Sequence, residues 1–139
     1  MSVVLGVALG AFLDGIVFHQ VLRWHHFVSE REPTDTVAGL DANTLADGLF
    51  HVFSYTVLLV AVWLLWRAGR EGTMPSGRLL LGGVLLGAGL FNVADGVLLH
   101  FALGLHHLRE GAGETVYDAV WLAINVGVAA LGAAVVHRP

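Results

Sequence analysis

The sequence predicts an all-α protein, a four-helix transmembrane bundle built from two parallel two-helix repeats. Of its 139 residues, 56% are hydrophobic and only 13% are charged, which is a composition typical of membrane proteins. Four apolar segments are each close to the roughly 20 residues that cross a bilayer as a helix. They lie at about 3–27, 46–67, 79–105 and 117–136. Because this length has room for one domain, we expect a single integral membrane domain over residues 1–139.

The first apolar segment contains an unusual string, D-G-x-x-x-H-x-x-x-x-x-H-H, made of Asp14, Gly15, His19, His25 and His26. The segment has no basic region ahead of its apolar run and no small-residue cleavage site before Asp14. We therefore expect a spanning helix rather than a cleaved signal peptide. Ionisable side chains at membrane depth are costly, and by default they mark a functional site.

The second segment begins near Asp47, and His51 follows one helical turn later. A carboxylate at the start of a helix caps it and interacts favourably with its dipole, so capping is the alternative to a functional role for Asp47. For His51, the alternative is a hydrogen bond between helices. The only long loop expected in the chain, from Ser29 to Asn43, precedes this segment.

The third segment repeats the whole string, and the members of this copy are Asp95, Gly96, His100, His106 and His107. The fourth segment carries Asp118 near its start, as the second carries Asp47. Repetition at identical spacing makes an accident improbable. We therefore predict two parallel halves related by a pseudo-two-fold axis along the membrane normal.

The distribution of arginine predicts the orientation of the chain. Arg67, Arg70 and Arg78 lie between the second and third segments, and Arg138 lies at the C-terminus, whereas the other two loops are rich in acidic residues. By the positive-inside rule, both termini are expected on the cytoplasmic side. The paired histidines would then lie near the outer face of the membrane.

Helix geometry separates the polar side chains into layers. In a continuous helix, His19 would lie about 10 Å from His26 and about 7.5 Å from Asp14 along the axis, so one straight helix cannot bring all of them to one ion. We expect Asp14 and Asp95 to support the ligands through hydrogen bonds, as carboxylates near metal-bound histidines commonly do. The expected metal ligands are His19, His25, His26, His51, His100, His106, His107, Asp47 and Asp118.

This ligand set favours a transition-metal site. The chain has no cysteine, and imidazole with carboxylate suits zinc, copper(II), iron or manganese. We favour copper because copper(II) stands highest in the affinity order for nitrogen ligands, with zinc or iron close behind. There are more candidate ligands than one ion needs, which fits a dinuclear site. The expected function is metal-centred redox chemistry or metal handling, such as delivery to a respiratory oxidase during its assembly.

The sequence does not decide whether the protein is an enzyme; if it is, a metal-dependent membrane oxidoreductase is expected. One alternative is a b-type haem held by His19 and His100 as axial ligands. Another is a structural subunit without a cofactor, in which the histidines join helices by hydrogen bonds. The expected partners are the lipid bilayer and another membrane protein, with homo-oligomerisation left open. Nucleic acid is not expected, because lysine is absent and the seven arginines are scattered.

Four stretches of the chain are distinctive: D-G-I-V-F-H-Q-V-L-R-W-H-H at 14–26, D-G-L-F-H at 47–51, G-L-F-N-V-A-D-G at 89–96 and G-L-H-H-L-R at 104–109. Together they resemble a bacterial family of small predicted membrane proteins that is catalogued only as a domain of unknown function. The resemblance covers nearly the whole chain and implies a four-helix protein of the bacterial inner membrane. The shared polar positions it implies are Asp14, His19, His25, His26, Asp47, His51, Asp95, His100, His106, His107 and Asp118. This chain has Leu99 and Phe101 beside His100 where many relatives have D-H-H, so it departs from the family pattern at those two flanking positions.

Overall fold

The computed structural model describes residues 1–138 and contains four long helical segments, with no strand in that range. Each segment is long and apolar enough to cross a membrane, so the all-helical class with four candidate spans is confirmed. The segments are α1 (Ser2–Asp14) continued by the π-helix η1 (Gly15–Val21), α2 (Val37–Glu71), α3 (Gly77–Asp95) continued by the π-helix η2 (Gly96–Ala102), and α4 (Glu114–His137).

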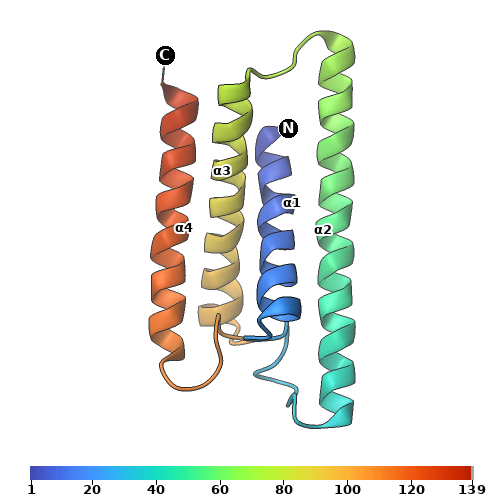
Figure 1. The fold of residues 1–139 in the computed structure, drawn as a ribbon, viewed down its shortest axis with the longest axis vertical. Coiled ribbons are helices and arrows are strands. Elements are labelled where there is room, and N and C mark those ends of the chain that lie inside the picture. The colour runs from blue at the N-terminus through green and yellow to red at the C-terminus, as the bar shows by residue number, and fades with distance from the viewer. Residues whose placement is uncertain (139) are drawn as a thin grey trace.

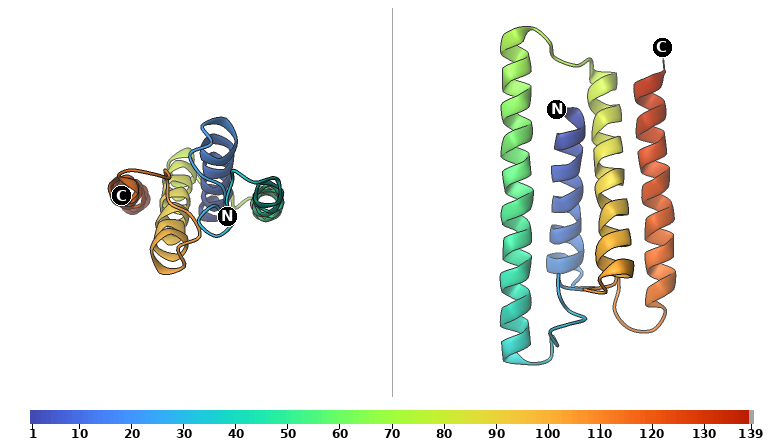
Figure 2. Two further views of the ribbon diagram at one scale, coloured as in Figure 1. Left: turned by 90° about the horizontal axis from the view of Figure 1, so that it is seen from below. Right: turned by 180° about the vertical axis from the view of Figure 1, so that it is seen from behind.

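The four helices stand in a row rather than around a common axis (Figures 1 and 2). α1 and α3 pack together in the middle, α2 packs against α1, and α4 packs against α3, whereas α2 and α4 do not touch. Both termini and the α2–α3 connection lie at one end of the row, and the other two connections lie at the opposite end (Figure 1). The row therefore leaves both long faces of the central pair open.

Small residues allow the central helices to approach closely. A methyl group added at Gly6 of α1 would collide with the carbonyl oxygen of Val84, and one added at Gly87 of α3 would collide with that of Val3. Gly132 makes the same kind of contact between α4 and Leu86 of α3. In lipid, where the hydrophobic effect does not drive helices together, such close backbone approach increases the van der Waals contact that helps to hold helices together.

The first and third helical segments end earlier than the sequence predicts, at Val21 and Ala102 instead of 27 and 105. Both end in the same way. Arg23 and Gly104 take left-handed backbone conformations, with φ of 50° and 54°, and reverse the chain. A backbone hydrogen bond closes each reversal, from Trp24 to Phe18 and from the equivalent Leu105 to Leu99, both 2.9 Å long. Apolar residues follow both reversals, so the hydropathy pattern did not reveal where the two helical segments end.

The second helix begins earlier than the sequence predicts, at Val37 instead of 46. Thr36 caps its start, because the hydroxyl oxygen accepts a hydrogen bond of 3.0 Å from the backbone N–H of Gly39. The first turns are polar and include Asp41 and Asn43, so they lie outside the apolar segment although they are helical.

Candidate metal centre

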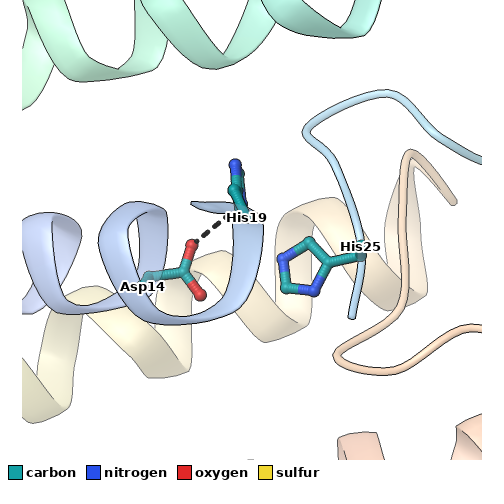
Figure 3. Close-up of side chains that lie close together, drawn as sticks. All are labelled: Asp14, His19 and His25. Carbon is teal, nitrogen blue, oxygen red and sulfur yellow. Dashed lines mark ion pairs between the residues drawn. The ribbon is translucent and has the colours of Figure 1, made fainter. Parts of the chain in front are cut away.

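Two clusters of ionisable side chains lie where the π-helices end. Asp14, His19 and His25 each offer one ligand atom, and these atoms lie within 4.8 Å of one another; Figure 3 shows this first cluster. The second cluster meets the same criterion and consists of Asp95, His100 and His106. All six residues are buried. The two copies of the repeated string therefore form matching groups of one carboxylate and two imidazoles.

The π-helices bring the aspartate and the first histidine of each cluster together. In a regular α-helix, residues five apart point about 140° away from each other. The wider π-helical turn closes its hydrogen bonds between residues five apart, so it reduces this angle. As a result, His19 Nε2 lies 3.3 Å from Asp14 Oδ2, and His100 Nε2 lies 3.3 Å from Asp95 Oδ2.

The chain reversal after each π-helix then returns the second histidine to the cluster. The ring centroids of His19 and His25 are 4.5 Å apart, and those of His100 and His106 are 4.7 Å apart. His25 and His106 also stack on each other across the centre, with centroids 4.5 Å apart and an interplanar angle of 2°. The two clusters thus form one continuous group of four imidazole rings.

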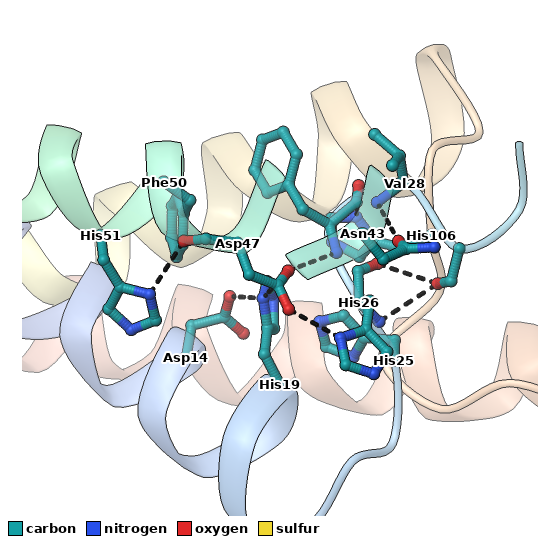
Figure 4. A network of polar contacts seen from close by, with 12 residues as sticks. Asp14, His19, His25, His26, Val28, Asn43, Asp47, Phe50, His51 and His106 are labelled. Carbon is teal, nitrogen blue, oxygen red and sulfur yellow. Dashed lines mark hydrogen bonds and ion pairs between the residues drawn. The ribbon is translucent and has the colours of Figure 1, made fainter. Parts of the chain in front are cut away.

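Aspartates on the flanking helices hold the first histidine of each cluster. His19 Nδ1 donates to Asp47 Oδ1 of α2 at 2.8 Å, and His100 Nδ1 donates to Asp118 Oδ1 of α4 at 2.7 Å. The network around Asp47 is shown in Figure 4. Ionised carboxylate oxygens only accept hydrogen bonds, so in the neutral ring this contact places the proton on Nδ1 and leaves the lone pair on Nε2.

Backbone carbonyls of the opposite loop hold the second histidine. His25 Nδ1 donates to the carbonyl of Leu108 at 2.8 Å, and His106 Nδ1 donates to the carbonyl of Phe27 at 3.0 Å. Each half of the chain therefore orients a histidine of the other half. His25 lies outside the candidate spans, and burial, together with the nearby His106 and His19 rings, lowers its pKa well below its usual range. Its ring is neutral, with a lone pair on Nε2.

The Nε2 atoms are the unsatisfied atoms of this centre. Those of His19, His25 and His106 are buried and make no hydrogen bond among residues 1–138, although Asp14 Oδ2 lies 3.3 Å from that of His19 and Asp95 Oδ2 lies 3.8 Å from that of His106. Leaving a buried polar atom without a hydrogen bond costs about 1–3 kcal/mol, so these atoms need an explanation. A metal ion ligated through Nε2, with Nδ1 hydrogen-bonded to an oxygen acceptor, is a recurrent arrangement in metalloproteins.

Asp47 and Asp118 make the same three contacts in the two halves. Asp47 accepts from His19, from His26 Nδ1 at 2.6 Å and from the Phe27 N–H at 2.9 Å. The matching donors to Asp118 are His100, His107 Nδ1 at 2.5 Å and the Leu108 N–H at 2.8 Å. Neither aspartate caps a helix, because α2 begins at Val37 and Gly113 precedes α4. The geometry thus places Asp14 and Asp95, rather than Asp47 and Asp118, among the side chains whose ligand atoms converge.

The remaining candidate histidines lie outside the two buried clusters. His26 and His107 each bind the aspartate of their own half, with side chains 19% and 21% exposed. His51 Nδ1 donates to the Asp47 carbonyl one turn earlier in α2. His107 also belongs to a third, more exposed group of ligand atoms with Glu30 and Glu114. Of each His-His pair, the first member enters the centre and the second remains near its edge.

Asn43, which no sequence pattern singled out, positions one of the loops. Asn43 is fully buried and accepts from the Val28 N–H while its amide donates to the carbonyls of Glu32 and Gly39. It ties the loop after His26 to α2. The burial of Asn43 appears only in the structure, and no side-chain pattern in the sequence marks it or the carbonyls of Phe27 and Leu108.

Comparison with known proteins identifies a family. The family model described as "Predicted membrane protein (DUF2243)" matches residues 1–139, and the chain belongs to this family. No curated protein and no solved structure matches the chain.

Proposed function

We propose that this member of the DUF2243 family binds two transition-metal ions, one in each Asp-His-His cluster. The observation that carries the proposal is the convergence of three buried ligand atoms within 4.8 Å in both clusters. It is supported by the unpaired Nε2 atoms and by the fixed Nδ1 hydrogen bonds, which leave Nε2 as the ligating atom.

In this proposal, the roles of the aspartates differ from those that the sequence predicts. Asp14 and Asp95 are ligands, whereas Asp47 and Asp118 orient the ligating histidines. His26 and His107 complete the hydrogen bonds of Asp47 and Asp118. The matching contacts also support a chain built from two repeats, with the centre on the pseudo-two-fold axis.

For the metal, we propose iron, manganese or zinc ahead of copper. Two imidazoles and one carboxylate form the ligand set of many non-haem iron sites and of catalytic zinc sites. A carboxylate in each cluster makes the site harder than the all-nitrogen set for which copper(II) is most favoured.

The burial of the ligands supports a resident cofactor over metal handling. A protein that passes an ion onward needs ligands that a partner can reach, but the four clustered histidines are at most 3% exposed. Three protein ligands per ion leave coordination positions for a substrate, and paired ions of this kind activate water or oxygen. We therefore propose a metal-dependent membrane oxidoreductase, with the positive-inside rule placing the centre toward the outer face.

The haem alternative has less support. The rings of His25 and His106 lie between those of His19 and His100, because ring contacts run from His19 to His25, then to His106 and then to His100. A haem between His19 and His100 would have to displace both rings. The structural alternative leaves the buried Nε2 atom of His25 without a hydrogen-bond or ion-pair partner.

Elemental analysis with an optical spectrum tests the proposal on protein purified in detergent. Wild type is expected to hold about two equivalents of metal, as a two-metal site requires. The double variant His25→Ala/His106→Ala is expected to lose both, while the matched variant His26→Ala/His107→Ala retains most of its metal. Size-exclusion chromatography and circular dichroism check that each variant folds. A wild-type protein that stays free of metal after iron, manganese, zinc and copper are each offered would overturn the proposal, and an intense Soret band would favour haem.

A further inference from the structure

An apolar groove opens beside the second cluster, between α2 and the α3–η2 segment. It has a volume of about 480 Å³. Its lining contains four phenylalanines, which are Phe27, Phe50, Phe53 and Phe91. Asp95 alone among the lining residues carries an ionisable side chain. The groove thus joins a ring-lined apolar wall to a carboxylate of the buried centre.

The phenylalanine rings form one layered group around Phe50. The centroids of Phe27, Phe53 and Phe91 lie 5.3, 6.5 and 6.2 Å from that of Phe50, with interplanar angles of 30° or less. Near-parallel rings at such spacing offer flat faces, on which another planar ring packs in an offset stack. A flexible acyl chain has no flat face that could stack on these rings.

The corresponding space in the other half of the molecule is filled. Aligning Asp47 with Asp118 places Trp121 at the position of Phe50 and Tyr117 at the position of Ala46. Trp121 packs edge-on against Phe18 of η1, with centroids 5.1 Å apart. Trp24 packs against Phe18 at 5.4 Å and against Tyr117 at 6.2 Å. Large aromatic side chains therefore fill the space beside α4, whereas the alanines and phenylalanines of the other half leave the equivalent space beside α2 open.

We propose that the open groove binds a membrane-soluble molecule with a planar ring head, whose oxygen atom points to the metal cluster at Asp95. This inference rests on the proposed function and names the substrate class of that centre. The groove is built by two candidate spanning helices, so its occupant comes from the bilayer. Its volume lies within the range of sites for small ligands.

The position of Asp95 explains how a bound head would reach the centre. Asp95 Oδ2 lies 3.3 Å from His100 Nε2 and 3.8 Å from His106 Nε2. The carboxylate is thus shared between the groove wall and the proposed metal site. A head oxygen at the groove floor would lie beside the proposed ion, which would have only three protein ligands and room for a further oxygen ligand.

Photoaffinity labelling tests the proposal on the full chain in lipid nanodiscs. The probe is an azido-substituted ubiquinone analogue with a short tail, and labelled peptides are mapped by mass spectrometry. The variant Ala46→Trp/Ala94→Trp fills the groove, and Leu13→Trp is the matched control, because Leu13 occupies the place of Ala94 in the first half. Metal content is measured on the same samples.

The expected result is labelling in the peptides that line the groove, reduced about tenfold by the filled variant and unchanged by Leu13→Trp. Unlabelled short-tailed ubiquinone should compete, whereas added phospholipid should not. Labelling spread over all lipid-facing helices, or labelling that survives the filled variant, would overturn the proposal and make the groove ordinary lipid space. Metal-loaded protein without groove labelling refutes this inference alone. Groove labelling on protein that never binds metal refutes the metal function and the orientation of the head toward it.

Discussion

The two halves of the molecule agree at the centre and differ at its edges. Around the clusters, every side-chain hydrogen bond of His19, His25 and Asp47 has its counterpart at His100, His106 and Asp118. Beyond them, α2 borders the apolar groove and also a second hollow of about 300 Å³, whereas α4 meets a packed aromatic group.

The difference separates the residues that would orient the ligands of the proposed metal ions from the residues that border the openings beside them. The hydrogen bonds that would orient the ligands are duplicated, so a change in either half is expected to disturb the proposed ion of that half. The residues that differ between the halves border the openings. The second hollow lies between η1 and α2 and is lined by His19, Arg23, His26 and Asp47 among others, so both openings are on the α2 side. The α4 side is closed by Trp24, Trp121 and Arg109, whose guanidinium lies 5.6 Å from the centroid of the Trp24 ring.

The largest expected effect comes from removing a ligand carboxylate in either half. Asp14→Asn and Asp95→Asn keep the size of the side chain but remove its charge, so each is expected to lose at least one of the two ions. Elemental analysis of purified protein measures the loss. Asp41→Asn, at an exposed position of α2, is the control and should retain all metal.

The metal contents of the Asp14→Asn and Asp95→Asn variants also test whether the two halves are equivalent. If only one of the two variants lost metal, the clusters would not be equivalent despite their matching contacts. Full metal content in both variants would remove Asp14 and Asp95 from the ligand set.

The sequence predicted the four spanning helices well because hydropathy depends only on composition. The repeated string also pointed to the residues that converge. It did not predict how they converge, because the straight-helix argument kept Asp14 away from His19. A π-helical turn and a chain reversal at Arg23 are determined by local backbone energies and packing, and the periodicity of residue types in the sequence does not reveal them. The choice between His25 and His26 likewise depends on the carbonyl of Leu108, which is invisible in the sequence pattern.

A smaller effect is expected from the aspartates that orient the histidines. Asp47→Asn and Asp118→Asn replace one carboxylate oxygen by an amide N–H, which would face a histidine or backbone N–H instead of accepting from it. Loss of such an orienting contact weakens metal binding by about 10–100-fold. Competition with a chelator of known affinity measures the change.

Because both aspartates make three matching contacts, their variants should weaken binding to a similar degree. Unchanged affinity in both would show that the hydrogen bonds do not orient the ligands. A loss of metal as complete as that in Asp14→Asn would instead return Asp47 to the role of ligand that the sequence predicts.

The smallest effect is expected at His51, which breaks the symmetry between the halves. The residue that corresponds to it in α4 is Leu122, so His51→Leu makes the first half resemble the second at this position. The imidazole donates to the Asp47 carbonyl within the same helix, and its loss should cost about 0.5–1.5 kcal/mol of stability. Thermal unfolding measures the loss of stability, and the same chelator competition measures metal affinity. The affinity should stay within about twofold of wild type, because the second half has a leucine at the matching position near Asp118. A drop in affinity comparable to that of Asp47→Asn would mean that His51 belongs to the metal centre, and that the first half holds its ion differently from the second.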